Sequence, residues 1–236
     1  MTDSDFPPPS GPVPGGRLAG VLYLVIIACG IGSEVFLRAP LMAAGGLPSV
    51  SPAEVASSLR WSLAADTIMV LADVALALVL FQLLKPVNAA AAMAAMVFRL
   101  VQAAILGANL LSQHMAVLIL EGAGLQGMGP GAPARLWLEL HGAGYDMGLF
   151  FFGINCLITG YLLFISGWLP KIFGIGLVAA GLVYLTGSTL RVLAPALSDD
   201  FALAYAIPLA AELAFALWLV VMGLGPKRAK GQKQPS

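Results

Sequence analysis

Residues 61–111 carry the stretch WSLAADTIMVLADVALALVLFQLL, then KPVN, then AAAAMAAMVFRLVQAAILGANLL, and this stretch decides the fold. A helix that crosses a bilayer needs about 20 mostly apolar residues. Both runs, Trp61–Leu84 and Ala89–Leu111, are long enough, and Lys85-Pro86-Val87-Asn88 between them is typical of a tight turn. Because unpaired backbone polar groups are costly in lipid, the two runs are predicted to be antiparallel transmembrane helices.

The rest of the chain continues this pattern. Four further apolar runs of spanning length lie at Leu18–Leu37, Trp137–Ile165, Ile172–Leu193 and Phe201–Leu224. Of the 236 residues, 59% are hydrophobic and 10% are charged, whereas a soluble domain carries about 25% charged residues. So few polar groups cannot cover a water-facing surface. The sequence therefore predicts an all-α, polytopic membrane helix bundle with six transmembrane helices, whose partner is the lipid bilayer.

Two tails flank the predicted six-helix domain of residues 17–225. Residues 1–16 are rich in proline and glycine, lack the features of a signal peptide, and are predicted to be a disordered cytoplasmic tail. Residues 226–236 are predicted to be a basic cytoplasmic tail. With both termini inside, the inner side holds Arg17, Lys85, Lys171, Lys227, Arg228, Lys230 and Lys233, and the outer side holds Arg38, Arg60, Arg135 and Arg191. This excess of basic residues favours cytoplasmic termini.

Charged side chains also occur inside the predicted spans. Each costs a few kcal/mol there, so such groups tend to face protein or water. Counting outward from the turn at Pro86 places Asp73 and Arg99 at the same depth, and they are predicted to form a structural ion pair. The same counting from the turn before the fifth span makes Asp146 and Arg191 nearly level.

Polar residues at helical spacing line one face of five spans, and this pattern is typical of a polar bundle interior. One hypothesis is a cavity that opens outward, closes near Asp73 and Arg99, and binds or transports a small zwitterionic or anionic molecule or an ion. In it Arg191 would contact the anion, and Asp66 or His141 would exchange a proton. The predicted ligand-binding residues are Asp66, Asn109, His141, Tyr145, Asp146 and Arg191. The alternative is that these groups hydrogen-bond one another in a structural or accessory subunit that has no ligand.

Other functions have less support. The net charge is zero and no large basic block indicates nucleic acid. A membrane-embedded hydrolase would need more than two histidines, and neither H-E-x-x-H nor G-x-S-x-G occurs. His114 and His141 could in principle be axial haem ligands, although a histidine hydrogen-bonded to a neighbour is the commoner case. Cys29 and Cys156 are expected to pack as small hydrophobes, and no cofactor or metal is predicted.

Four motifs carry a resemblance to a known family. They are RLAGVLYLVII from Arg17, LLKPVN from Leu83, FRLVQA from Phe98, and FFGINCLITGYLLFISGWLPKIFGIGLVAAGLVYL from Phe151. Together they resemble the bacterial membrane family called domain of unknown function 4386, from Arg17 to about Leu224. The resemblance implies six spans in a bacterial inner membrane. It implies no activity and no catalytic residues.

Overall fold

The computed structural model describes residues 15–42, 51–122, 131–167, 169–198 and 200–223. Within these ranges six helices are long and apolar enough to cross a membrane: Gly16–Met42, Pro52–Leu84, Ala89–Leu120, Gly131–Ile165, Lys171–Leu193 and Ala202–Met222. The predicted all-α, six-span fold is confirmed. The predicted tails lie outside the described residues, apart from Gly15 and Gly16, and α1 already begins at Gly16.

Four of the spans are single α-helices. They are α4 (Pro52–Leu84), α5 (Ala89–Leu120), α6 (Gly131–Ile165) and α7 (Lys171–Leu193). The first span is composite, with α1 (Gly16–Ile31), the π-helical segment η1 (Gly32–Arg38) and α2 (Ala39–Met42). The last span consists of a 3-10 turn, η3 (Ala202–Tyr205), and α8 (Ala206–Met222), and a second 3-10 turn, η2 (Pro195–Leu197), follows α7.

The helix boundaries follow from local chemistry. Ser51 caps α4 in a full capping box with Glu54, and Pro52 occupies the first helical position. Asn88 caps α5 by accepting a hydrogen bond from the Ala91 amide at 2.9 Å. The two caps mark where α4 and α5 begin, and the hydrogen-bonded turn at 85–88 joins the helices as a hairpin.

The first span contains an irregular segment, the π-helical η1, which carries Glu34 and Arg38. Pro208 produces no comparable irregularity, because it lies in the first turn of α8, where its missing N–H removes no helical hydrogen bond. A π-helical turn takes an extra residue, so it rotates the side chains that follow it relative to an α-helix, and such turns are frequent at functional sites.

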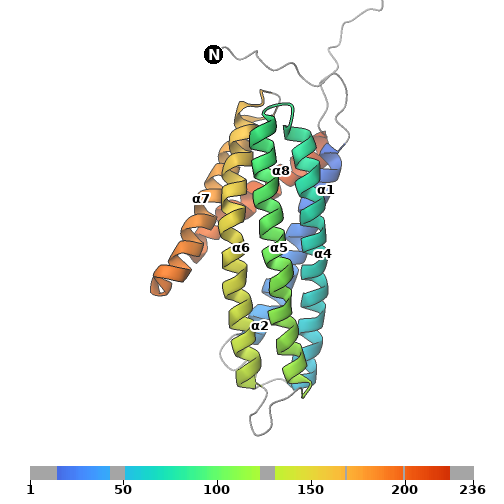
Figure 1. Cartoon of the computed structure of the whole chain (residues 1–236), viewed down its shortest axis with the longest axis vertical. Coiled ribbons are helices and arrows are strands. Elements are labelled where there is room, and N and C mark those ends of the chain that lie inside the picture. The colour runs from blue at the N-terminus through green and yellow to red at the C-terminus, as the bar shows by residue number, and fades with distance from the viewer. Residues whose placement is uncertain (1–14, 43–50, 123–130, 168, 199, 224–236) are drawn as a thin grey trace, which may run out of the picture.

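The six spans form a closed ring. In chain order each span packs on the next, and the first span also packs on the last, because α1 contacts both α4 and α8. Figure 1 shows α4, α5 and α6 side by side along the long axis, with α7 leaning away from them toward its C-terminal end. We call the end of the ring that holds Gly15, the turn at 85–88, Lys171 and Gly223 the terminal end, and the opposite end the distal end.

Glycines bring α6 and α7 into backbone contact. A Cβ at Gly160 would lie 2.6 Å from the carbonyl oxygen of Gly174, and one at Gly174 would lie 2.7 Å from that of Gly160. Nearer the distal end, a Cβ at Gly181 would lie 2.7 Å from the carbonyl oxygen of Gly153. Four glycines at heptad spacing therefore set the distance between these two helices.

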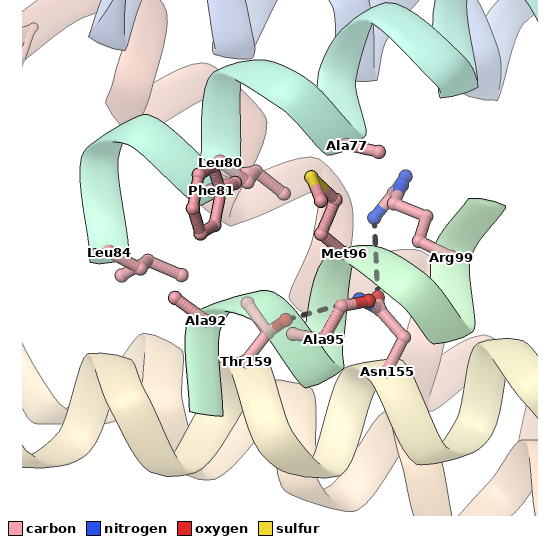
Figure 2. Close-up of a pocket in the computed structure, with 10 residues that line it drawn as sticks. All are labelled: Ala77, Leu80, Phe81, Leu84, Ala92, Ala95, Met96, Arg99, Asn155 and Thr159. Carbon is pink, nitrogen blue, oxygen red and sulfur yellow. Dashed lines mark hydrogen bonds between the residues drawn. The ribbon is translucent and has the colours of Figure 1, made fainter. Parts of the chain in front are cut away.

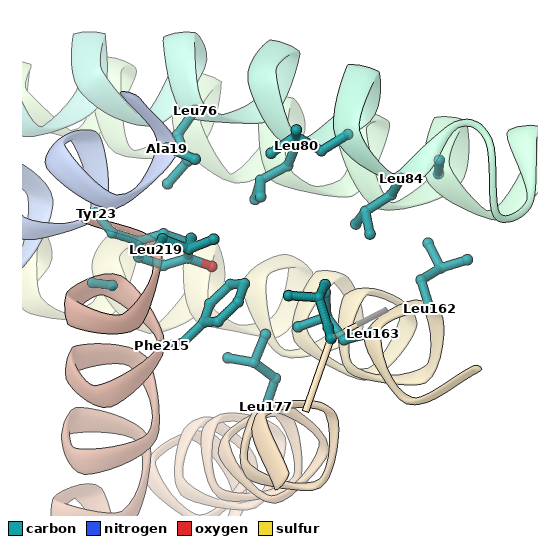
Figure 3. Packing of buried hydrophobic residues seen from close by; sticks show 14 of the residues in the cluster. Ala19, Tyr23, Leu76, Leu80, Leu84, Leu162, Leu163, Leu177, Phe215 and Leu219 are labelled. Atoms are coloured by element: carbon teal, nitrogen blue, oxygen red, sulfur yellow. The ribbon is translucent and has the colours of Figure 1, made fainter. Parts of the chain in front are cut away.

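The terminal half of the ring is filled by an apolar core. Side chains from α1, α4, α6, α7 and α8 meet there, and Figure 3 shows Tyr23, Phe215, Leu177 and Leu219 converging on the ring axis. The Tyr23 and Phe215 rings pack edge to face with centroids 5.8 Å apart. These side chains are at most 1% exposed, so the terminal half of the ring is sealed.

Candidate functional site

A cavity of about 350 Å³ lies inside the ring, on the distal side of this core. Every span contributes to its wall, so the cavity is a property of the whole ring and not of one helix pair. Its apolar wall includes Ile27, Met69, Leu106 and Leu149. The polar or ionisable lining residues are Glu34, Asp73, Gln102, Tyr145, Tyr184, Tyr205 and Glu212.

The opening of the cavity lies between the distal parts of the first and last spans. On α1, Gly20 packs against the α8 backbone, since a Cβ there would lie 2.7 Å from Val220 N. At the distal level the lining residues of these spans are exposed: the Glu34 side chain is 64% exposed and Leu209 is 43% exposed. On the opposite wall Leu106 and Leu149 are buried. The cavity is therefore open beside Glu34 and Leu209.

Arg99 and Asp73 lie at the inner end of the cavity. The Arg99 Nε donates to Asp73 Oδ1 at 2.8 Å, and Nη2 lies 2.6 Å from the same oxygen. When the Gln102 side-chain amide is turned so that its NH2 group faces acceptors, it donates to Asp73 Oδ2 at 2.6 Å. The structure thus brings together the two residues predicted to pair, and both oxygens of this lining carboxylate have donors.

The Arg99 guanidinium is covered on its other sides. It lies over the rings of Tyr23 and Phe152, each 5.0 Å from the centroid. Figure 2 shows it reaching Asn155, whose Oδ1 accepts a hydrogen bond at 3.4 Å, beside a void of about 10 Å³. Asn155 in turn donates to the Ala95 carbonyl at 2.8 Å. Arg99 is held in place by protein groups and is not among the residues that line the large cavity.

Glu212 differs from the other two carboxylates of the cavity, Glu34 and Asp73, which each pair with an arginine. It is 6% exposed and lines the wall from α8. The Tyr184 hydroxyl donates to its Oε1 at 2.7 Å. No lysine, arginine or histidine within the described ranges forms an ion pair with it. A buried carboxylate of this kind either holds a proton or has a positively charged partner from outside the protein.

A second polar cluster lies at the distal end and outside the cavity. Arg38 Nη1 contacts Asp66 Oδ2 and also donates to Ser33 Oγ at 2.7 Å and Ser62 Oγ at 2.9 Å. Gln113 donates to Ser62 Oγ at 2.8 Å. The η1 segment also leaves Arg38 close to Glu34, with Nη2 to Oε2 at 2.8 Å. Asp66 is therefore part of a hydrogen-bond network that joins η1, α4 and α5.

Four of the other predicted ligand-binding residues form two contacting pairs, Asn109 with His141 and Asp146 with Arg191. Asn109 donates to the His141 carbonyl at 2.6 Å, and the His141 Nδ1 lies 3.2 Å from the Asn109 carbonyl oxygen. Arg191 Nε lies 3.0 Å from Asp146 Oδ2. These contacts tie α5 to α6 and α6 to α7.

His114 and His141 lie in different surroundings. His114 is on the exposed face of α5, whereas His141 is 4% exposed inside the bundle. This arrangement does not support the pair as axial haem ligands. Among the described residues no group of three histidine, cysteine, aspartate or glutamate side chains could hold a metal ion.

Of the six residues predicted to bind a ligand, only Tyr145 lines the cavity. Asp66, Asn109, His141, Asp146 and Arg191 are engaged in the contacts described above. The polar faces that helical spacing predicts for the third, fifth and sixth spans include the lining residues Gln102, Tyr184, Tyr205 and Glu212. Helical spacing does not indicate which of these residues have partners within the protein.

The fold and its internal cavity define a multi-pass α-helical membrane protein. The chain belongs to the family described as Domain of unknown function (DUF4386), whose sequence profile matches residues 18–223. The resemblance predicted from the motifs is therefore confirmed. A relative from Archaeoglobus fulgidus, described as an uncharacterized protein, is 27% identical over 163 residues, which cover 69% of this chain and 84% of the relative. No solved structure matches the chain.

Proposed function

We propose that this protein binds a small organic molecule in the cavity inside its helix ring. The observation that carries the proposal is the cavity itself, which is about 350 Å³ in volume and is lined by all six spans. Ligand sites are concave, mostly apolar, and carry a few well-placed polar groups, and this lining has that composition. The apolar core closes the terminal side of the site, and the exposed lining residues Glu34 and Leu209 lie on its distal side.

We further propose that the protein lies in the cell (inner) membrane with both termini in the cytoplasm and the cavity open to the outside. The basic residues of the sequence support this orientation. Lysine and arginine near the ends of spans favour the cytoplasmic side, whereas aspartate and glutamate contribute little. By sequence, the side of the termini has seven of them and the other side has four: Arg17, Lys85, Lys171, Lys227, Arg228, Lys230 and Lys233 against Arg38, Arg60, Arg135 and Arg191.

A reporter fusion tests this orientation. Alkaline phosphatase fused after Met128, between α5 and α6, should be active because the distal end faces outside. The same reporter fused after Ser236 should be silent. An active C-terminal fusion together with a silent fusion after Met128 would reverse the orientation.

Cysteine labelling tests the cavity. In a background with Cys29→Ala and Cys156→Ala, the lining positions Leu106→Cys and Leu149→Cys should react with a small, membrane-impermeant methanethiosulfonate added from outside. Leu138→Cys provides the matched control, because Leu138 is also a buried leucine but packs in a separate core cluster and is not part of the lining. It should stay unlabelled.

The exposed position Arg135→Cys reports full access to the reagent. If Leu106→Cys and Leu149→Cys remain as unreactive as Leu138→Cys in folded protein, while Arg135→Cys labels completely, a water-accessible cavity is excluded.

A further inference from the structure

We propose that the cavity selects a positively charged organic ligand, an amine or quaternary ammonium with an apolar body, and that Glu212 supplies the negative charge that holds it. This inference rests on the proposed function, because it names the class of molecule that the cavity binds. It replaces the zwitterionic or anionic ligand expected from the sequence.

The charges around the cavity are not balanced. Three carboxylates line it: Glu34, Asp73 and Glu212. Arg99 neutralises Asp73, but Arg38 is shared between Glu34 and Asp66. Glu212 has no cationic partner among the described side chains. The lining therefore has an excess of negative charge, which favours cations over anions.

Glu212 is placed to receive a ligand. Its side chain is buried in the cavity wall, and the hydrogen bond from Tyr184 at 2.7 Å fixes Oε1. Among the described residues no hydrogen bond to the second oxygen, Oε2, is present, and Glu212 lines the cavity. A cation beside Glu212 would complete an ion pair between mostly apolar walls, where the attraction is stronger than in bulk water.

Aromatic rings line the cavity together with Glu212. The Phe152 and Tyr184 ring centroids are 5.2 Å apart, and those of Tyr184 and Tyr205 are 6.1 Å apart. Tyr145 adds a fourth ring to the lining. Aromatic faces attract ammonium groups and are a recurrent means of recognising quaternary ammonium ligands. The rings and the carboxylate thus select for the same ligand charge.

An anionic ligand finds no available cation. Arg99 is covered by Asp73, Tyr23 and Phe152. Arg191, the anion contact expected from the sequence, pairs with Asp146 and does not line the cavity. No arginine, lysine or histidine is among the lining residues that the structure describes.

The experiment compares two thiol reagents of opposite charge at Leu149→Cys in the cysteine-free background. One is trimethylammonioethyl methanethiosulfonate, and the other is sulfonatoethyl methanethiosulfonate. Each rate is divided by the rate of the same reagent with 2-mercaptoethanol in solution, which removes the difference in intrinsic reactivity. The normalised preference for the cation should be at least about tenfold, because Glu212 attracts one reagent and repels the other.

Glu212→Gln should reduce this preference by about tenfold, since it removes the charge while keeping an acceptor for Tyr184. Glu139→Gln removes an exposed carboxylate outside the cavity and should leave the preference unchanged. Benzyltrimethylammonium should also protect Leu149→Cys from labelling more strongly than its neutral isostere neopentylbenzene, a comparison that needs no substitution at Glu212.

The outcomes separate the two proposals. If both reagents label Leu149→Cys with equal normalised rates and the two isosteres protect equally, Glu212 carries a proton and the inference fails, while the cavity remains a binding site. If neither reagent labels Leu149→Cys, the water-accessible cavity and the inference fail together. A cation preference that Glu139→Gln reduces as much as Glu212→Gln assigns it to the general surface charge and also overturns the inference.

Discussion

Arg99→Leu lowers the free energy of unfolding by about 3–5 kcal/mol, the range expected when one partner of a buried ion pair is removed. The variant leaves Asp73 as an unpaired carboxylate that is 3% exposed. It also removes the cation from between the Tyr23 and Phe152 rings and leaves Asn155 without this donor. The thermal unfolding midpoint in detergent, followed by size-exclusion chromatography, measures the loss.

Asp73→Leu combined with Arg99→Leu should be less harmful than Arg99→Leu alone, because no unpaired charge remains. Arg135→Leu is the matched control. It breaks an ion pair between two residues one helical turn apart, with both side chains more than half exposed, and such pairs contribute about 0–1 kcal/mol. If the effects of Asp73→Leu and Arg99→Leu simply add in the double variant, the pair carries no coupling energy.

Gly160→Ala destabilises the protein by about 1–3 kcal/mol, the usual cost of inserting extra volume into a packed interior. The new methyl group would lie 2.6 Å from the Gly174 carbonyl oxygen and 2.8 Å from Val178 N. Both are backbone atoms, so α6 and α7 must move apart. Gly174→Ala should cost a similar amount for the same reason, because it meets the Gly160 carbonyl from the other side.

The control for this prediction is Gly142→Ala on the same helix, since no atom lies within 4 Å of a Cβ there. It should be neutral or stabilising by up to about 1 kcal/mol, because alanine is the better helix former. Combining Gly160→Ala with Gly174→Ala should cost less than the sum of the two, since one separation of the helices accommodates both methyl groups. Equal unfolding midpoints for Gly142→Ala and Gly160→Ala would show that close approach at Gly160 is not required.

The sequence predicts the fold because length and hydropathy are sufficient to identify membrane-spanning helices. It also predicts contacts within a hairpin, since two helices that share a short turn have matching depths. The contact between Asp73 and Arg99 is of this kind, with the Lys85–Asn88 turn as the common origin for counting. No packing detail is needed for such a prediction.

When two spans are not joined by a short turn, counting residues from a common turn cannot predict which of their side chains are in contact. Arg38 and Asp66 are separated by residues 43–50, and the π-helical segment η1 changes the direction in which Arg38 points. A helical wheel drawn at α-helical spacing therefore misplaces Arg38 and leaves Asp66 apparently available for a ligand. Glu212 poses the opposite problem. Its place on a polar face of the sixth span can be predicted from the sequence, but only the packed ring shows that no cation among the described residues pairs with it.

The closure of the ring by α1 and α8 has a consequence for biosynthesis. The span that contains α1 is synthesised well before α8, so the contact at Gly20 cannot form while α8 is still being made. Until then the spans from α1 to α7 can form only an open arc, in which the lining side chains are not enclosed. Insertion of α8 is the step that converts this arc into an enclosed compartment.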